Sequence, residues 1–430
     1  MHYFSTNLSS PVATFKEAVL NGQPDDGGLY FPSEIPQLSA EKLASIAETD
    51  NADIAFQIIR PYVAGDIEDD NLYQICSETV DFPFPLVRIT ENISALELFH
   101  GPTYAFKDVG ARFMSRCLRQ FAAEKQEKAI VIVATSGDTG GAVANGFAGV
   151  DGVEVIILYP KNKVSRLQEQ QLTTLGGNVT TLELHGDFDD CQKLAKQALA
   201  DNDLRSRVFL TSANSINVAR WLPQQFYYFF AAKQAPGCVP VFSVPSGNFG
   251  NICAGMVAAA SGLPAKRFIA ACNANDVVPR FLTTEVYEPA AAVATLSNAM
   301  DVGDPSNFVR VMQLFGHDVI RLREFVSAVR VSDEETAVIM RQVHAKYGYV
   351  LDPHGAVAFY ALSKYLDAHP GQKGVFLETA HPVKFDSVET IIGSYGEMPA
   401  GVDELMKRKK VSIEAEVDYD ILRQVIESKI

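Results

Sequence analysis

A series of short, almost uninterrupted apolar runs dominates the chain from about residue 129 onward. The runs are AIVIVAT, VEVIILYP, NVTTLEL, VPVFSV, RFIAACN and GVFLET. Each run is rich in Val or other apolar residues and lacks regular polar alternation, so each predicts a strand that is covered on both faces. Helix-like segments separate the runs, for example residues 109–125 and 217–233. Strands that alternate with helices predict an α/β fold with open parallel sheets, in which ligands bind at the carboxyl ends of the strands.

The first 95 residues differ from this pattern. They carry turn signals, GQPDDGG at 22–28 and FPSEIP at 31–36, and helix-like stretches such as AEKLASIAETD. We therefore predict a separate, mostly helical N-terminal region over residues 1–95. A chain of 430 residues is also too long for one ordinary core, which favours two or three domains.

Charge and hydropathy exclude several classes of partner. The formal net charge of −15 disfavours nucleic acid, because binding its phosphates requires a basic face. Small anionic substrates stay possible, since a few local donors and helix N-termini can hold them. No apolar run approaches the roughly 20 residues that span a bilayer, and the opening residues lack the basic and apolar stretches of a secretory signal. We expect neither a membrane partner nor export.

The cysteines predict reduced thiols in a reducing compartment, the cytoplasm. They are scattered, with no CxxC motif and no pairing rhythm. Their positions are Cys76, Cys117, Cys191, Cys238, Cys253 and Cys272. No Cys/His cluster has the spacing of zinc ligands, so we expect no metal site.

One strand end has the features of a phosphate-binding loop. An apolar run at 239–244 leads into SGNFGN at 246–251 and then into a helix of small residues. Glycines let the backbone approach an anion closely, and the helix N-terminus presents unpaired N–H groups. The Gly-Lys-Ser/Thr of nucleotide-triphosphate loops is absent, which disfavours that chemistry. The same pattern is also typical of a strand-to-helix turn that binds nothing.

A second strand end repeats this arrangement. The run AIVIVAT leads into SGDTGG at 136–141 and then into the helix-like AVANGFAG. Hydroxyls and exposed amides at a helix start suit a carboxylate or a phosphate. Ser, Asp and Thr are also ordinary helix-capping residues, so a plain capping turn is the alternative. A substrate and a cofactor that are both anionic would require two such loops.

Lys107 lies in the apolar stretch LFHGPTYAFKDVGARF, just before a predicted helix. Apolar surroundings lower the pKa of a lysine because desolvation disfavours its charged form. A neutral amine is the form that Schiff-base chemistry requires. Taken alone, a lysine with apolar neighbours more commonly extends its amine to solvent.

Seven segments along the chain carry a family resemblance. They are HGPTYAFKD, TSGDTGGA, LYPKNKVSRLQEQQLTTLGGN, SANSINVARW, VPSGNFGN, LSNAMDVGDPSNF and ETAHPVKF. Together, and in this order, they resemble the threonine synthases that have an extended N-terminal region. The resemblance covers essentially the whole chain, including GGLYFP near its start. It implies a pyridoxal-phosphate (PLP) enzyme of the tryptophan-synthase β-like fold.

The resemblance also implies a domain organisation and cofactor contacts. Residues 96–109 and 216–430 would form the large PLP-binding domain, and residues 110–215 a smaller mobile domain. Lys107 would be the Schiff-base lysine, and Thr379 would face the pyridine nitrogen. The loop that holds the cofactor phosphate would consist of Gly247, Asn248, Phe249, Gly250 and Asn251. Asp138 would lie beside the phenolic oxygen, where many relatives in the wider fold have Asn, and its carboxylate would need a proton or a donor there.

Substrate contacts follow from the same resemblance. The α-carboxylate would bind at Ser136, Gly137, Thr139 and Gly140. The substrate phosphate would bind at Asn214, Ser215, Asn217 and Arg220, with Lys163 as an additional positive charge. Arginine offers a planar fork that matches phosphate oxygens, although a surface arginine after a capped helix is the alternative. His354 and His381 are expected to be structural, because no Ser/His/Asp arrangement accompanies them.

The implied reaction is the last step of threonine biosynthesis. The enzyme would eliminate phosphate from O-phospho-L-homoserine and add water to give L-threonine, with Lys107 moving the protons. Two related activities stay open at this point: a phospho-lyase that releases 2-oxobutyrate and ammonia, and a serine or threonine dehydratase, which has no need for an Arg220 cluster. A non-catalytic PLP-binding paralogue is disfavoured, because such a copy does not need Lys107. The sequence leaves open whether the chain is a monomer or a homodimer.

Overall fold

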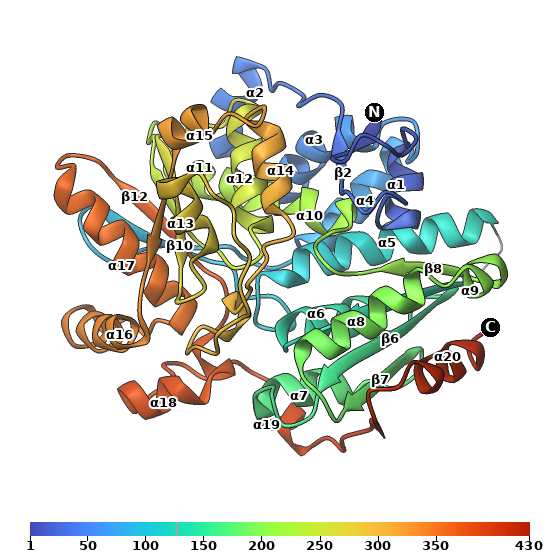
Figure 1. Cartoon of the computed structure of the whole chain (residues 1–430). Helices are drawn as coiled ribbons and strands as arrows, with labels where there is room; N and C mark the ends of the chain where they lie inside the picture. Colours follow the sequence, from blue (N-terminus) through green and yellow to red (C-terminus); the bar gives the residue numbers. More distant parts are fainter. Residues whose placement is uncertain (126–127) are drawn as a thin grey trace.

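The computed structural model of the protein describes residues 1–125 and 128–430, and two separate sheets organise most of them (Figure 1). Residues 126–127, within the predicted smaller domain, lie outside the described part. A third, two-stranded sheet belongs to the N-terminal region. The expected α/β fold with parallel sheets is confirmed.

The larger sheet has six strands in the order β11-β10-β9-β12-β4-β3. Their bounds are β3 (Leu86–Arg88), β4 (Ile93–Glu97), β9 (Val241–Pro245), β10 (Arg267–Cys272), β11 (Val326–Arg330) and β12 (Gly374–Glu378). All neighbours are parallel except β3 and β4. Phe376, at the centre of the sheet, pairs with Ala95 on one side and Ser243 on the other. Because the strands run parallel, their carboxyl ends meet at one edge of the sheet.

Helices cover both faces of this sheet, which explains why its strands are apolar throughout. Phe268 and Ala270 pack into one apolar cluster, and Ile269 and Ala271 pack into another on the opposite face. The helices of this half are α10 (Val218–Trp221), α11 (Phe226–Gln234), α12 (Gly250–Ala260), α13 (Val277–Thr284), α14 (Phe308–Leu314), α15 (Val319–Phe325), α16 (Asp333–Tyr347), α17 (Pro353–Ala368) and α18 (Asp386–Ile392). Short 3-10 helices lie at Leu222–Gln225, Asn298–Met300 and Pro382–Lys384, and the first of them contains Pro223.

The smaller sheet has five parallel strands in the order β13-β7-β6-β5-β8. Their bounds are β5 (Ala129–Ala134), β6 (Val153–Pro160), β7 (Val179–Leu184), β8 (Phe209–Ser212) and β13 (Ile413–Ala415). Its helices are α6 (Asp138–Phe147), α7 (Arg166–Thr173), α8 (Phe188–Leu199) and α9 (Asn202–Arg207). The long helix α5 (Lys107–Lys125) packs against α6 and connects the two sheets.

The C-terminal end of the chain departs from the predicted domain boundary. Residues 216–430 were all expected in the larger domain, but β13 pairs with β7 at the edge of the smaller sheet. Helix α20 (Tyr419–Glu427) packs on α8, and α19 (Val402–Lys407) packs on α7 (Figure 1). Strand β3, predicted within the N-terminal region, instead extends the larger sheet. The C-terminal segment and β3 therefore each belong to a different part of the fold from the one predicted.

The N-terminal region is mostly helical, as expected, and shares its core with α5. Its elements are β1 (Tyr3–Ser5), α1 (Phe15–Asn21), β2 (Tyr30–Pro32), α2 (Ala40–Ala44), a 3-10 helix at Ile46–Glu48, α3 (Asn51–Val63) and α4 (Asp69–Thr79). Thr14 and Glu17 form a capping box that starts α1. The ring of Phe15 lies 6.5 Å from that of Phe113 and 6.4 Å from that of Phe121, centroid to centroid. This region is therefore packed onto the rest of the protein.

Two further observations concern the predicted environment. All six cysteines are unpaired, and all but Cys238 are buried. Over residues 1–125 and 128–430, none of the helices combines the length and the apolar character needed to cross a bilayer.

Candidate active site

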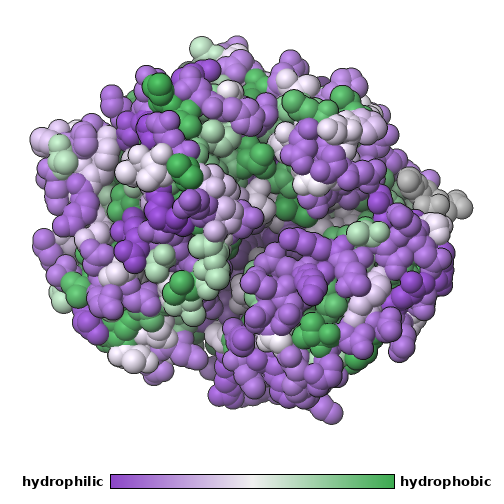
Figure 2. Space-filling view, viewed as in Figure 1, coloured by the Kyte–Doolittle hydropathy of each residue, from purple (hydrophilic) through white to green (hydrophobic). Residues whose placement is uncertain are grey.

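A cleft of about 1270 Å³ lies between the two sheets, and the space-filling view shows it as a hollow in the surface (Figure 2). The carboxyl ends of β5, β9 and β12 open onto it, as the parallel topology predicts. Segments 20–29 of the N-terminal region and 298–306 of the larger half form further parts of its walls. The N-terminal region therefore contributes directly to the cleft.

Lys107 is the first residue of α5, and backbone pairing fixes it beside the end of β12. The amide of Phe106 donates to the carbonyl of Thr379 at 2.9 Å, and the amide of His381 donates to the carbonyl of Tyr104 at 3.0 Å. Thr379, which is buried, lines the cleft together with Lys107. Two segments far apart in the sequence thus bring these two predicted residues together.

The surroundings of Lys107 favour a neutral amine. Burial lowers the pKa of Lys107, and the nearby cations of Lys384 and Arg220 lower it further, while the Asp138 carboxylate opposes them. Its Nζ lies 5.7 Å from the centroid of the Phe106 ring. A lysine in this environment more readily offers the unprotonated amine that attacks a carbonyl carbon.

The glycine loop after β9 has the geometry of an anion site. Phe249 adopts a left-handed conformation, with φ of 62°, and leads directly into the eleven-residue helix α12. A side chain at Gly247 would stand 2.5 Å from the Cα of Met300, so only glycine fits there. The Oδ1 of Asn251 accepts from the Tyr228 hydroxyl at 2.8 Å, but its buried Nδ2 has no partner among the described residues. That amide is a donor available to a phosphate at the start of α12.

In the loop after β5, two backbone amides form hydrogen bonds within the loop itself. The Oγ1 of Thr135 accepts from the amides of Gly137 and Gly140, at 2.9 and 2.8 Å. Ser136 and Thr139 line the cleft, whereas Gly137 and Gly140 do not. The amides of the two glycines are therefore committed to the shape of the loop, and Ser136 and Thr139 are the residues placed to meet a substrate.

The carboxylate of Asp138 has hydrogen-bond donors, which its expected position beside the phenolic oxygen requires. Its Oδ1 lies 2.9 Å from the Nζ of Lys384 and 2.9 Å from the Nε2 of Gln168. Burial acts to raise the pKa of Asp138, but Lys384, Lys107 and the hydrogen bonds outweigh burial and hold it below its usual range. Lys384 was not singled out from the sequence, although it lies in the ETAHPVKF segment, five residues after Thr379.

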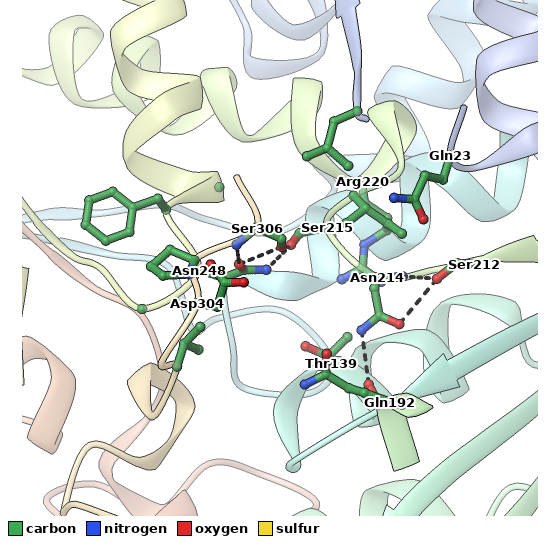
Figure 3. Close-up of a pocket in the computed structure, with 18 of the residues that line it drawn as sticks. Gln23, Thr139, Gln192, Ser212, Asn214, Ser215, Arg220, Asn248, Asp304 and Ser306 are labelled. Atoms are coloured by element: carbon green, nitrogen blue, oxygen red, sulfur yellow. Dashed lines mark hydrogen bonds between the residues drawn. The ribbon is translucent and has the colours of Figure 1, made fainter. Parts of the chain in front are cut away.

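Arg220 is a buried cation at the cleft rather than a surface arginine. Only 4% of it is exposed, and burial lowers its pKa to about 10. Its Nη1 donates to the carbonyl of Ala213 at 2.8 Å, and its Nε is buried without a hydrogen-bond partner in the described part of the chain. It lines the same cavity as Asn214 and Ser215 (Figure 3). An anion at this point would meet an uncommitted donor.

The side chains of Asn214 and Ser215 are partly occupied in shaping the cleft. Asn214 donates to the carbonyl of Ala134 at 3.0 Å, which ties the ends of β5 and β8 together. The Ser215 hydroxyl accepts from the side-chain amide of Asn248 at 2.9 Å (Figure 3) and from that of Asn307 at 3.0 Å. The predicted phosphate segment is thus bonded directly to the glycine loop.

In addition to Gly137 and Gly140, two predicted substrate residues lie outside the cleft lining. The side chain of Asn217 caps α10 through the amide of Ala219 at 3.0 Å and donates to the carbonyl of Val19 at 2.9 Å. Asn217 is fully buried, and its side chain is occupied by these two bonds. It therefore acts as a helix cap. Lys163 is exposed and lines a separate surface hollow with Lys161 and His185. Neither residue contacts the cavity that the other predicted residues share.

Arg310, which the sequence did not single out, supports the 214–217 segment. This arginine is completely buried, and its guanidinium lies 4.3 Å from the centroid of the Trp221 ring. It donates to the carbonyls of Ser215, Ile216 and Tyr30, at 3.1, 2.6 and 3.1 Å. No local sequence pattern marks it, since these carbonyls come from two distant segments, at Tyr30 and at 215–216.

The two histidines are bonded within the protein framework. The Nδ1 of His354 lies 2.5 Å from Asp352, and its Nε2 accepts from the amide of Ala299 at 3.2 Å. His381 accepts from the amide of Val383 at 3.1 Å, and burial lowers its pKa to about 4. His354 supports the 298–306 wall of the cleft through this contact.

Comparison with known proteins identifies the family. Residues 85–379 match the family model of the pyridoxal-phosphate-dependent enzymes. Residues 2–80 match the threonine synthase N-terminal model, and residues 355–426 match the threonine synthase C-terminal model. A threonine synthase of Haemophilus influenzae is 44% identical over 98% of this chain and 99% of its own length.

Solved structures agree with the sequence comparisons. The threonine synthase of Escherichia coli superposes with a TM-score of 0.93 at 41% identity, covering all of both chains. A PLP-bound threonine synthase of Brucella melitensis gives a TM-score of 0.94 at 36% identity, covering 100% of this chain and 99% of the other. The unpartnered Nδ2 of Asn251 at the glycine loop fits the phosphate of that cofactor, and Lys107 fits its aldehyde. The chain therefore belongs to the threonine synthase family of pyridoxal-phosphate-dependent enzymes.

Proposed function

We propose that the protein converts O-phospho-L-homoserine and water into L-threonine and phosphate. The observation that carries this proposal is the position of Lys107 in one cleft with two distinct groups of anion donors, at Asn251 and at Arg220. A cofactor phosphate and a substrate phosphate require two such groups. PLP, when bound, supplies an aldehyde for the lysine and a ring that accepts electrons from the substrate Cα.

We assign the cofactor end of the cleft to the loop from Gly247 to Asn251, with Asn248, Phe249 and Gly250 between them. The helix dipole of α12 and the free amide of Asn251 support phosphate binding there. Thr379, at the end of β12, offers a neutral hydroxyl to the pyridine nitrogen. Asp138 faces the ring oxygen, with its own charge balanced by Lys384.

We assign the substrate end to residues from the smaller sheet and the segment after it. Ser136 and Thr139, at the start of α6, bind the α-carboxylate, where the helix N-terminus favours negative charge. Arg220, with Ser215 and Asn214 beside it, binds the phosphate. Lys107 removes the protons from Cα and then Cβ, after which phosphate leaves from Cγ. It returns a proton at Cγ and, once water has added at Cβ, at Cα, because its amine is the base fixed in the cleft.

The arrangement favours this reaction over a serine or threonine dehydratase. A dehydratase substrate carries no phosphate, and a buried arginine with an unsatisfied Nε would then cost stability without a function.

Closure of the smaller half over the cleft would exclude water until the addition step, consistent with the predicted mobility of residues 110–215. The unpaired, mostly buried thiols support a location in the cytoplasm. The proposed partner there is a small-molecule substrate.

Replacement of Lys107 tests the assignment. We expect Lys107→Ala to abolish the near-visible absorbance of lysine-bound PLP and to lower kcat by at least about 10²–10⁴-fold, the usual contribution of a general base. Lys42→Ala, at an exposed lysine, is the matched control and should keep both properties. Product analysis with O-phospho-L-homoserine completes the test. Formation of 2-oxobutyrate and ammonia in place of threonine would overturn the proposal.

A further inference from the structure

Lys384 is a lysine with no exposure to solvent, and its ammonium has three oxygen partners. It donates to the carbonyl of Thr103 at 2.7 Å and to the Oε1 of Gln171 at 2.9 Å, and it forms an ion pair with Asp138, whose Oδ1 lies 2.9 Å from its Nζ. The two hydrogen bonds and the ion pair hold the cation in place between these three groups.

The three partners come from different parts of the fold. Lys384 follows β12 of the larger sheet, and Thr103 lies four residues before Lys107. Asp138 begins α6 and Gln171 lies in α7, both beside the smaller sheet. Lys384 thus connects the two halves of the molecule directly at the cleft that Asp138 lines.

Stability alone gives a weak reason for such a pair. Removing two charges from water costs several kcal/mol per ion, and an apolar pair of similar volume commonly stabilises a core as well or better. The location of the pair offers a different reason. Asp138 lies close enough to Lys107 to affect its charge, and Lys384 acts on Lys107 with the opposite sign. The charges of Asp138 and Lys384 therefore oppose each other at the reactive amine, and Arg220 adds a further positive charge there.

We propose that Lys384 is a positioning residue that neutralises Asp138 and fixes its carboxylate, so that the cofactor site requires matched charges at residues 138 and 384. The inference rests on the proposed function of Lys107 and Asp138 at the cofactor. Under this inference, Lys384 is the reason that a carboxylate can lie beside the ring oxygen. Uncharged residues at both positions 138 and 384 would leave the charge at the cofactor unchanged.

Four forms of the enzyme test this inference: the parent, Lys384→Met, Asp138→Asn and the double variant. The measurement is the pH midpoint at which the near-visible absorbance of bound PLP changes. Lys384→Met leaves a carboxylate unpaired, which stabilises a nearby positive charge, so the midpoint should rise by about one pH unit or more. Asp138→Asn leaves an unpaired ammonium, so the midpoint should fall by a similar amount. The double variant should return to within about half a unit of the parent, because its charges match again.

A control separates this effect from the general loss of a paired lysine. Lys410 bonds Glu169 and Glu183, both at 2.7 Å, outside the cleft lining. Lys410→Met should leave the midpoint unchanged. If Lys384→Met and the double variant shift the midpoint equally, or if neither single variant shifts it, Lys384 is only a structural tie and the inference is wrong.

The test remains decisive if Lys384→Met does not fold. Asp138→Asn alone must still lower the midpoint, and an unchanged value overturns the inference. Its failure is also distinct from failure of the proposed function. In the first case the parent binds PLP and makes threonine while the variants behave like it, and in the second case the parent itself lacks the absorbance or the product.

Discussion

Two buried donors that have no partner among the described residues, the Nε of Arg220 and the Nδ2 of Asn251, belong to residues that line the cleft. An unsatisfied buried donor costs about 1–3 kcal/mol, so a folded protein rarely keeps one without a reason. Both residues line the same cleft as Lys107. Under the proposed function, one donor would meet the cofactor phosphate and the other the substrate phosphate.

Asn251 offers a direct test of the cofactor side. We expect Asn251→Ala to weaken PLP binding by about 10- to 150-fold, since one hydrogen bond to a charged phosphate is worth about 1.5–3 kcal/mol. Titration of the apoenzyme with PLP, followed by absorbance, gives the dissociation constant. Asn92→Ala, at an exposed asparagine, should bind like the parent. An unchanged constant for Asn251→Ala would remove this amide from the phosphate site.

Sequence alone was informative at residues whose function lies in a local motif. Lys107 and the glycine loop each stand in a distinctive segment, and the structure brings them to one cleft. Lys384 and Arg310 were missed for a physical reason. Whether a cation is buried depends on partners contributed by distant segments, such as Thr103 and Tyr30. Asn217 shows the converse, because a capping residue and a phosphate donor look alike in a linear sequence.

Among elements, the 214–217 segment depends on α14 for its shape. Arg310 of α14 holds the carbonyls of Ser215 and Ile216, and so positions the turn that leads to Arg220. The segment has little regular structure of its own before α10 begins. A single buried guanidinium thus replaces the backbone ladder that would normally fix a binding loop.

We expect Arg310→Met to disturb this segment strongly. It leaves the carbonyls of Ser215, Ile216 and Tyr30 without their donor, and each lost bond to a charged group costs about 1.5–3 kcal/mol. The thermal midpoint should fall, and KM for the phosphorylated substrate should rise by at least about tenfold. Arg321→Met, at an exposed arginine of α15, is the control and should match the parent. An Arg310→Met enzyme with parental KM would show that the segment is held by other contacts.

The prediction of elements succeeded where length and hydropathy are strong. The apolar runs that begin at 129 became strands β5, β6, β7, β9, β10 and β12. Strand β13 escaped notice because it has only three residues, two of them exposed, and its sequence IEA carries no apolar run. Its position is decided by pairing with β7, a contact that no local pattern encodes.

At the scale of the whole molecule, the last residues of the chain complete the smaller sheet. Leu422 and Ile426 of α20 are fully buried in the cluster formed by β6, β7 and α8. Lys384 at the site and this C-terminal crossing at the far edge of the sheet both join the two halves of the cleft.

Truncation of Leu422 tests the importance of the crossing. Leu422→Ala should lower the free energy of local unfolding by about 2–5 kcal/mol, the usual cost of a large-to-small change in a core. Hydrogen exchange should therefore accelerate in β7 far more than in β12, because α20 packs on the smaller sheet. Ile320→Ala, at a side chain that is 68% exposed, should change neither. Equal acceleration in both strands would contradict a local role.

The pairing of β13 with β7 also governs how the protein is made. Roughly 230 residues separate the two strands, and at about 5–20 residues per second a ribosome needs on the order of ten to fifty seconds to add them. Throughout that time the growing chain presents β7 as an open hydrogen-bonding edge, a surface to which other nascent strands can attach. Because its edge strand comes from so far along the chain, this half of the enzyme becomes protected only when β13 has been made, well after the synthesis of its own segment.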